Sequence, residues 1–245
     1  MSSSRLPGKV MRVLDGKNPL IYYVIEQMKN CKKVDKIIVA TSDDKEDDVI
    51  EKFVSNLGID CFRGELNNVL DRYYKCAKKF KLSAIVRITC DNPLMDPSIV
   101  DNLVSIFEQT DNDLVVNIKE RTFPHGTEVE VFSFNALEKV WKSAKLPSEQ
   151  EHVTPFFYNH SEKFKIFNVK NEKNLSSFRW TVDREDDFKL VSELVKIIKK
   201  RPILMVDILE TLEKNPYLKM INQNHDPLEG YKKSLADDKQ FLKLT

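Results

Sequence analysis

The first half of the chain alternates strand-like segments with helix-like segments, joined by short connections. Each short apolar run of buried-strand type is followed by a segment whose apolar residues recur at helical spacing. Because such alternation builds a parallel sheet with helices on both faces, we expect an α/β fold. The strand-like runs are 36–41, 59–62, 84–88 and 113–117, and the helix-like segments are 49–57, 69–77 and one that begins at Asp96-Pro97.

From about Thr122 the pattern changes. Residues 128–134 alternate polar and apolar side chains, which predicts a strand with two differently used faces. We expect helices near 136–143 and 151–158, strands near 164–169 and 178–182, and a long amphipathic helix from about residue 185. No repeat or linker interrupts the chain, so we expect one domain over 1–221 with an inserted lobe at about 122–178. The tail, 222–245, is polar, and we expect it to be loosely held.

Charge and cysteine content exclude several classes of protein. The chain has 39 Lys and Arg against 38 Asp and Glu, a net charge of +1 that gives no general field for nucleic acid. No apolar run reaches the ~20 residues of a membrane span, and the N-terminus lacks the apolar core of a secretory signal. The four cysteines lie far apart, which disfavours disulfides and zinc fingers. We therefore expect a cytoplasmic protein with no nucleic-acid or membrane partner.

Two carboxylates follow strand-like segments. Asp91 comes after the 84–88 run, and Asp183 after the 178–182 run. Ligands of open parallel sheets bind beyond the carboxyl ends of the strands, and Mg²⁺ takes one or two carboxylates together with substrate phosphates. A joint Mg²⁺ site is one interpretation. The alternative is that Asp183 caps the following helix and Asp91 is a turn residue.

A second candidate site lies near the N-terminus. Arg5 and Lys9 are four residues apart, with hydroxyl side chains before them and a Pro-Gly turn between, a pattern that suits a polyphosphate. It is not a Walker A loop, because Ser3 stands where the first glycine belongs and Val10 follows the lysine. The chain has only 6 glycines, so side chains must do more of any phosphate binding. The alternative is an ordinary basic tail.

Neither the histidines nor the cysteines form a nucleophilic site. His152 and His160 are eight residues apart without a Glu-x-x-His companion, and no Gly-x-Ser-x-Gly elbow or Cys/His pair occurs. We therefore do not expect covalent catalysis.

Taken in order, these and further motifs resemble one family. The set is similar to the F-type proteins of spore coat polysaccharide biosynthesis, relatives of the CMP-Kdo and CMP-acylneuraminate synthetases, and the resemblance covers nearly the whole chain. The matching segments are Ser4–Met11, Val39–Asp44, Phe62–Glu65, Asn68–Tyr74, Val86–Leu94, Arg121–Phe132, Glu151–Pro155, Thr181–Asp183 and Glu229–Leu235.

The resemblance implies a nucleotide-diphosphosugar transferase fold, Rossmann-like and three-layered, with a mostly parallel sheet. It also implies a reaction of CTP in which a sugar hydroxyl attacks the α-phosphorus and pyrophosphate leaves. Such chemistry depends on positioning and charge neutralisation. The relatives further imply a homodimer through the lobe.

The resemblance assigns roles to particular residues. Arg5 and Lys9 match the family's triphosphate-binding cations and are expected to act with Asp91 in catalysis, while Asp91 and Asp183 match its Mg²⁺ ligands. The segments that line the nucleotide side contain Ser4, Arg63, Gly64 and Arg87. The lobe that faces the sugar contributes His125, Glu128, Glu151 and His152.

Two departures from the family bear on activity. Cys90 stands beside the metal aspartate where Gly or Ala is usual, which adds bulk close to the phosphates. Met1 stands inside the Ser-rich loop, whereas relatives carry a buried strand ending in Gln-Ala-Arg before it. We expect a sheet without this first strand, whose two neighbours lack ladder partners.

Three readings of the function follow. The first is an Mg²⁺-dependent cytidylyltransferase. The second is a truncated, non-catalytic homologue that binds a nucleotide or sugar, and the third is a nucleotidyltransferase that uses UTP or GTP. The sugar acceptor cannot be read from the sequence, because acceptor pockets of this fold are shaped by the variable lobe.

Overall fold

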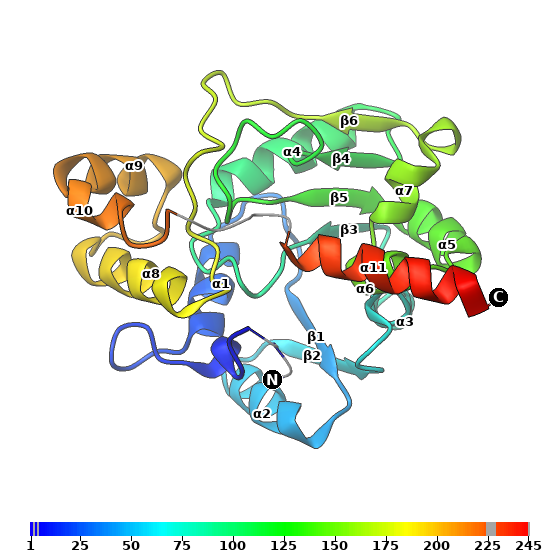
Figure 1. The fold of residues 1–245 in the computed structure, drawn as a ribbon, viewed down its shortest axis with the longest axis horizontal. Helices are drawn as coiled ribbons and strands as arrows, with labels where there is room; N and C mark the ends of the chain where they lie inside the picture. The colour runs from blue at the N-terminus through cyan, green and yellow to red at the C-terminus, as the bar shows by residue number, and fades with distance from the viewer. Residues whose placement is uncertain (2, 4, 224–228, 245) are drawn as a thin grey trace.

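The computed structural model describes residues 1, 3, 5–223 and 229–244. Its strands belong to two sheets (Figure 1). The strands are β1 (Ile38–Ser42), β2 (Asp60–Gly64), β3 (Ala84–Arg87), β4 (Leu114–Val116), β5 (Glu130–Ser133) and β6 (Ile166–Asn168). The helices are α1 (Leu20–Met28), α2 (Asp48–Asn56), α3 (Val69–Lys79), α4 (Pro97–Gln109), α5 (Phe134–Ser143), α6 (Pro147–His152), α7 (Pro155–Asn159), α8 (Glu185–Ile197), α9 (Met205–Lys214), α10 (Pro216–Lys219) and α11 (Glu229–Leu244).

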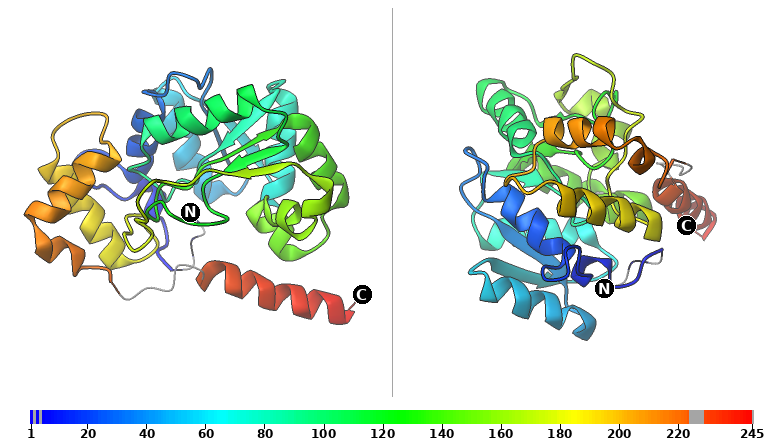
Figure 2. Two further views of the ribbon diagram at one scale, coloured as in Figure 1. Left: turned by 90° about the horizontal axis from the view of Figure 1, so that it is seen from above. Right: turned by 90° about the vertical axis from the view of Figure 1, so that its left-hand side faces the viewer.

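The larger sheet has the order β3-β5-β4-β6, in which β4 and β6 are parallel and β5 runs against its two neighbours. Side chains of β4 point alternately to its two faces. Leu114 and Val116 join a core with α3 and α5, whereas Val115 joins another with α4. Figure 2 shows α4 lying along one face of this sheet. The α/β class and the mostly parallel strands are confirmed.

The smaller sheet pairs β1 and β2 in parallel, with α2 packed against both strands. No ladder joins β1 to β3 within the described residues, so each of these strands has one edge without a strand partner. This is the break expected of a fold that lacks one central strand.

Three expected elements differ. Residues 178–182 form no strand, because only a single bridge joins Arg179 to His125 and the segment otherwise bonds to loops. Residues 151–158 are divided between α6 and α7, since Val153 has a positive φ of 71° that ends the first helix. The polar tail is not loosely held: most of it forms α11, which packs on α6.

Strand β5 was expected to use its two faces differently, yet it is buried on both. Its polar residue Glu130 is 1% exposed, because helices cover both faces of the sheet and Arg87 of β3 neutralises the carboxylate. No helix among the described residues is long and apolar enough to cross a membrane. The boundaries of the domain, lobe and tail stay predictions.

A further hydrophobic cluster fixes the position of the N-terminal loop. Helices α1, α8, α9 and α10 enclose a cluster that includes Leu6 and Trp180, both buried. Figure 2 shows this helical group beside the sheet, with α8 and α9 nearest the viewer in its right-hand view. Leu6 thereby ties the loop that carries Arg5 and Lys9 to the segment that carries Asp183.

Candidate active site

The loop that carries Arg5 and Lys9 is fixed at both ends. Leu6 is 7% exposed, and Gly8 adopts a left-handed conformation (φ 67°) that turns the chain into the short 3₁₀ helix Lys9–Met11. Arg12 then makes two hydrogen bonds to Glu185, at 2.5 and 2.7 Å, and its guanidinium lies 4.0 Å from the Phe188 ring centre. The loop is thus packed against the rest of the protein and does not extend from it as a free tail.

Lys9 reaches both predicted metal ligands. Its Nζ lies 3.3 Å from Asp91 Oδ2 and 3.0 Å from Asp183 Oδ1, and it donates to the carbonyl oxygen of Val182 at 2.7 Å. Arg5 Nη2 lies 2.7 Å from the same oxygen of Asp183. The structure therefore brings together Arg5, Lys9, Asp91 and Asp183 around one ammonium group.

The segment around Asp183 is held by a fully buried carboxylate. Asp187, in the first turn of α8, accepts from the backbone N–H groups of Asp183 and Arg184 and from the guanidinium of Arg179. Asp187 therefore supplies the helix-capping contact, and Asp183 does not cap α8. Its carboxylate points instead to the cations, with Arg179 Nη2 3.0 Å from Oδ2.

The opposite charges of Lys9 and Asp183 each shift the pKa of the other group toward its charged form. Burial by itself raises the pKa of Asp183, but the charge of Lys9 and the hydrogen bonds from Arg5 and Lys9 outweigh burial and hold that pKa well below its usual range. Burial by itself lowers the pKa of Lys9, yet Asp91 and Asp183 raise it overall. Asp183 is ionised and Lys9 protonated at neutral pH.

Asp91 is joined to the same centre by its backbone. Its carbonyl oxygen accepts from the N–H of Val182 at 2.8 Å and from Thr181 Oγ1 at 3.3 Å, and Thr89 Oγ1 donates to its carboxylate. These bonds connect the loop after β3 directly to the segment before α8. The two aspartates face one another because their chain segments are hydrogen-bonded side by side.

The donor set fits a small divalent cation that also binds phosphate. Among the described residues no group of three or more His, Cys, Asp and Glu side chains is arranged around a metal position. The Asp91–Asp183 pair already converges on one positive charge, the ammonium of Lys9. Two carboxylates completed by waters and phosphate oxygens is how Mg²⁺ is commonly bound.

The residues predicted to line the nucleotide side differ in how the structure places them. Ser4 lies outside the described residues. The Arg63 guanidinium donates to Ser42, Asp44, Asp48 and Glu51, so any contact with a nucleotide would come in addition to these bonds. Gly64 ends β2 beside Ser42 of β1.

Arg87 ends β3 opposite Glu130 of β5 and forms a buried ion pair with it. Thr154 donates to the second oxygen of Glu130 at 2.6 Å. Glu130 therefore joins the end of β3 to the segment before α7, and the role of Arg87 toward a nucleotide stays a prediction.

Two of the predicted sugar-side residues hold the lobe against the Asp91 loop. Glu128 accepts from Arg121, from the N–H of Gly126 and from the side chain of Asn92. Burial, aided by the charges of Arg121 and Arg179, lowers the pKa of His125 to about 4, so this imidazole is neutral at pH 7. Their contact with a sugar stays a prediction.

The other two predicted sugar-side residues meet the C-terminal helix. Ser234 of α11 lies with its Oγ 2.9 Å from His152 Nε2 and donates to Glu151 Oε2 at 2.6 Å. One turn further along α11, Asp238 accepts from the backbone N–H and hydroxyl of Ser148, at 2.8 and 2.6 Å. Helix α11 is therefore held against Glu151 and His152, whose contact with a sugar stays a prediction.

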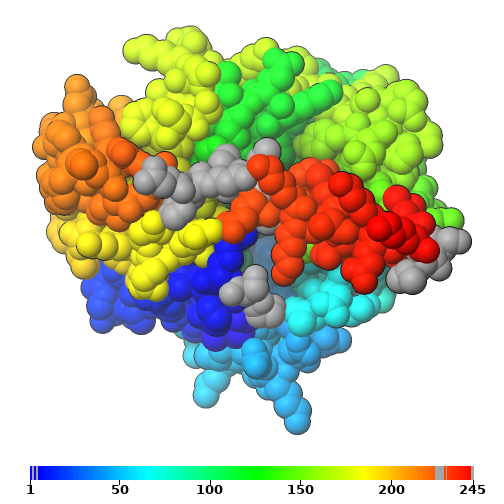
Figure 3. Space-filling model, in the orientation of Figure 1, coloured from blue at the N-terminus to red at the C-terminus, as the bar shows by residue number. Residues whose placement is uncertain are grey.

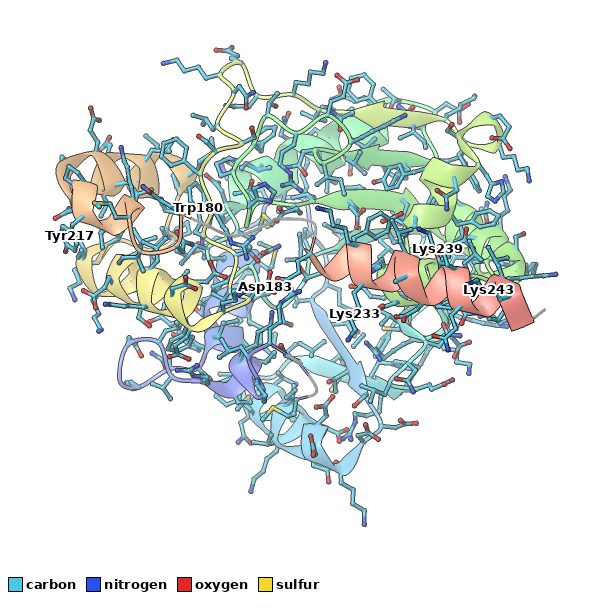
Figure 4. The ribbon with its side chains drawn as sticks, viewed as in Figure 1. Trp180, Asp183, Tyr217, Lys233, Lys239 and Lys243 are labelled. Carbon is cyan, nitrogen blue, oxygen red and sulfur yellow. The ribbon has the colours of Figure 1, made fainter. Side chains whose placement is uncertain are left out.

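The space-filling view shows a hollow between α11, α8 and the N-terminal loop, with the blue of β1 at its floor (Figure 3). In Figure 4 Asp183 lies at the left-hand rim of this space and Lys233 of α11 lies on the opposite side, while Lys239 and Lys243 lie farther along the helix. Arg184, next to Asp183, is joined to Glu229 of α11 at 2.6 Å. The hollow is bordered by residues from both ends of the chain.

Sequence reasoning missed several supporting residues. Thr89, Arg179 and Asp187 hold the aspartates, and Arg12 holds the cationic loop. Their signal was weak, because each acts through a partner distant in sequence or through a backbone N–H. Only the three acidic residues that open α8 marked that helix end as a place where a carboxylate would cap.

A mostly parallel α/β fold with two cations and two carboxylates gathered beside its sheet is the arrangement that the sequence led us to expect of a nucleotidyltransferase. A cytidylyltransferase family model matches residues 1–233, and the chain belongs to that family. It is therefore a nucleotidyltransferase that uses CTP.

Known proteins agree with this membership. The spore coat polysaccharide biosynthesis protein SpsF of Bacillus subtilis is 31% identical over 88% of this chain and 92% of its own length. An uncharacterized protein of Methanocaldococcus jannaschii is 39% identical over 91% of this chain and 90% of its own. A cytidylyltransferase structure from Leptospira borgpetersenii has 32% identity and a TM-score of 0.86, covering 92% of this chain and 94% of that one.

Proposed function

We propose that the protein is a magnesium-dependent cytidylyltransferase that transfers CMP from CTP to a sugar or sugar acid, releasing pyrophosphate, for surface polysaccharide or glycan biosynthesis. The observation that carries the proposal is the convergence of Asp91 and Asp183 on Lys9, with Arg5 beside them. The polysaccharide protein of Bacillus subtilis and the 3-deoxy-manno-octulosonate cytidylyltransferases among the relatives support a sugar as acceptor.

In this reaction a bond forms between a sugar hydroxyl oxygen and the α-phosphorus of CTP. The bond from that phosphorus to the oxygen bridging to the β-phosphate breaks, pyrophosphate leaves, and the hydroxyl proton passes to solvent. A bound magnesium ion, held by Asp91 and Asp183, would neutralise phosphate charge. Arg5 and Lys9 bind the triphosphate, orient it for in-line attack and neutralise charge on the leaving group.

Pyrophosphate release from CTP with Mg²⁺ and a panel of sugar acids tests the proposal. Asp91→Ala and Asp183→Ala should each lose activity by orders of magnitude, whereas Asp111→Ala should not, since that side chain is 96% exposed and pairs with Lys165 at the surface. Wild-type rates in either of the first two variants would remove that residue from the metal site.

Replacing CTP by UTP or GTP in the same assay tests the choice of nucleotide. Binding of CTP without turnover, measured by calorimetry, would instead support a non-catalytic binder. The expected homodimer through the lobe is tested by light scattering of the full chain.

A further inference from the structure

Arg72, on α3, carries a charge that no acidic side chain neutralises. Its Nη1 donates to the backbone carbonyl oxygens of Glu65, at 2.7 Å, and Leu66, at 3.4 Å. Its Nε–H is buried and has no hydrogen-bond acceptor. No described carboxylate lies within ion-pair distance of this guanidinium.

Neighbouring arginines differ from Arg72 in this respect. Each of them meets at least one carboxylate: Arg63 pairs with Asp48 and Glu51, Arg87 with Glu130, and Arg179 with Asp183 and Asp187. Burial lowers the pKa of Arg72, whereas the pKa of each of these other three is raised. A half-buried guanidinium without a counter-ion is costly in the free protein, so a ligand that neutralises it would bind with added strength.

Arg72 lies on α3 beside the end of β2. Its stem packs against Gly64, where an added Cβ would lie 3.2 Å from Arg72 Cγ. The Cys90 thiol, next to Asp91, lies within electrostatic reach of both Arg72 and Lys9. Arg72 and Lys9 therefore both act on the side chain that precedes Asp91.

The substrate brings more negative charge than the known cations offset. A nucleoside triphosphate carries about four negative charges and one magnesium ion offsets two of them. Asp91 and Asp183 add two, which Arg5 and Lys9 already balance in the free protein. A further cation is needed on the nucleotide side.

We propose that Arg72 is a nucleotide-binding residue whose buried Nε–H donates to a phosphate oxygen of CTP. The inference rests on the proposed function, since it takes CTP as the ligand. It extends the triphosphate site from the N-terminal loop to α3, so that the phosphates lie between two segments more than sixty residues apart in sequence.

Nuclear magnetic resonance of the arginine Nε–H groups tests this without a mutation. In wild-type protein the Arg72 signal, assigned by its loss in Arg72→Lys, should shift downfield with CTP and with inorganic pyrophosphate and stay in place with cytidine. A shift with cytidine alone would place the contact on the base and overturn the proposal. So would an unmoved signal in protein that calorimetry shows to be saturated with CTP.

Calorimetry with variants provides the second test. Arg72→Met should weaken CTP binding about 10- to 100-fold, the effect of one charged hydrogen bond. Arg72→Lys, which keeps the charge without the Nε–H, should fall between. Lys75→Met removes the same charge one turn along α3 from an exposed side chain and should change CTP affinity less than about twofold.

The failures are distinguishable. Wild-type protein that binds no CTP would contradict the proposed function itself. Wild-type protein that binds CTP while Arg72→Met binds it equally well would contradict only the role of Arg72. If Arg72→Met does not fold, Arg72→Lys and the wild-type Nε–H signal decide the question.

Discussion

Asp187 holds Asp183 by its backbone: the N–H of Asp183 donates to Asp187 Oδ2 at 3.0 Å. One carboxylate thus positions another without touching its side chain. Because Asp187 also accepts from Arg179 and Asn222, the chain segment that carries Asp183 has little freedom to move. The predicted metal ligand Asp183 is positioned by a residue that is fully buried and cannot itself contact a substrate.

Replacing Asp187 should therefore damage both stability and activity. Asp187→Asn leaves Arg179 without its buried counter-charge, and we expect the free energy of unfolding to fall by about 3 kcal/mol. Urea denaturation measures this. Glu193→Gln, a change at a partly exposed position on the same helix, should stay within about 0.5 kcal/mol of wild type. Equal stability of the two variants would show that Asp187 is not a structural anchor.

Lys9 occupies the position that a metal ion would share with the aspartates. In Lys9→Met we expect turnover to fall about 10²- to 10³-fold, the usual effect of removing one group that stabilises developing charge. Mg²⁺ alone should raise the melting temperature of this variant more than that of wild type, because no ammonium competes for the carboxylates.

The added change Asp91→Asn serves as the control for Lys9→Met. It should abolish the extra Mg²⁺ stabilisation of the variant. A melting temperature that does not respond to Mg²⁺ in Lys9→Met would argue against a metal at this pair.

Gly126 lies where no side chain fits. An added Cβ would lie 2.7 Å from both the backbone nitrogen of Thr181 and Trp180 Cδ1, at a φ of 106°. Gly126→Ala should lower the free energy of unfolding by about 3 kcal/mol or more. The matched control is Gly16→Ala, which has a φ of 83° but no atom within 4 Å and should cost about 1–2 kcal/mol. Similar losses in both would mean that the contact with 180–181 is unimportant.

Stability should fall on mild acidification because of His125. Its pKa is about 4 in the folded protein and near 6.5 unfolded, so protons bind more readily to the unfolded chain. Its contribution is complete above pH 6.5 and is lost as the pH falls toward 4. In the His125→Gln variant, the free energy of unfolding should depend less on pH within that window. The partly buried Asp183 contributes at lower pH, because its depressed pKa makes stability fall below about pH 4.

An unchanged slope in His125→Gln would assign the loss to another group. His152, whose pKa burial also lowers, is the alternative, and His152→Gln provides the comparison.

The sequence predicted most of the helices and strands where local signals were strong. The apolar run before Asp91 and the Pro-Gly turn before Lys9 are local features, and the ordered motifs linked them to Asp183. Their convergence on one ammonium group was expected from two strand ends, but residues 178–182 form no strand, and a backbone hydrogen bond from Val182 to Asp91 brings the two segments together instead.

The parts that the sequence did not predict depend on distant partners. Glu130 looks like a solvent-facing residue of an alternating strand until Arg87 of the neighbouring strand neutralises it. The polar tail looks like a mobile end, because the residues that fix it, Ser234 and Asp238, bond to backbone and side chains of α6. Arg63 looks like a free cation, and only the fold shows that its donors are already used.

The two separate sheets have a mechanical consequence. Since no ladder in the described chain joins β1 to β3, β1 and β2 belong to a different hydrogen-bonded unit from the strands that carry the Asp91 loop. A nucleotide held from one side by Lys9 and from the other by the β2–α3 region would span that seam. Bound substrate would then hold the two sheets together. Amide exchange in β1 and β2 should therefore be slower with substrate bound than without it.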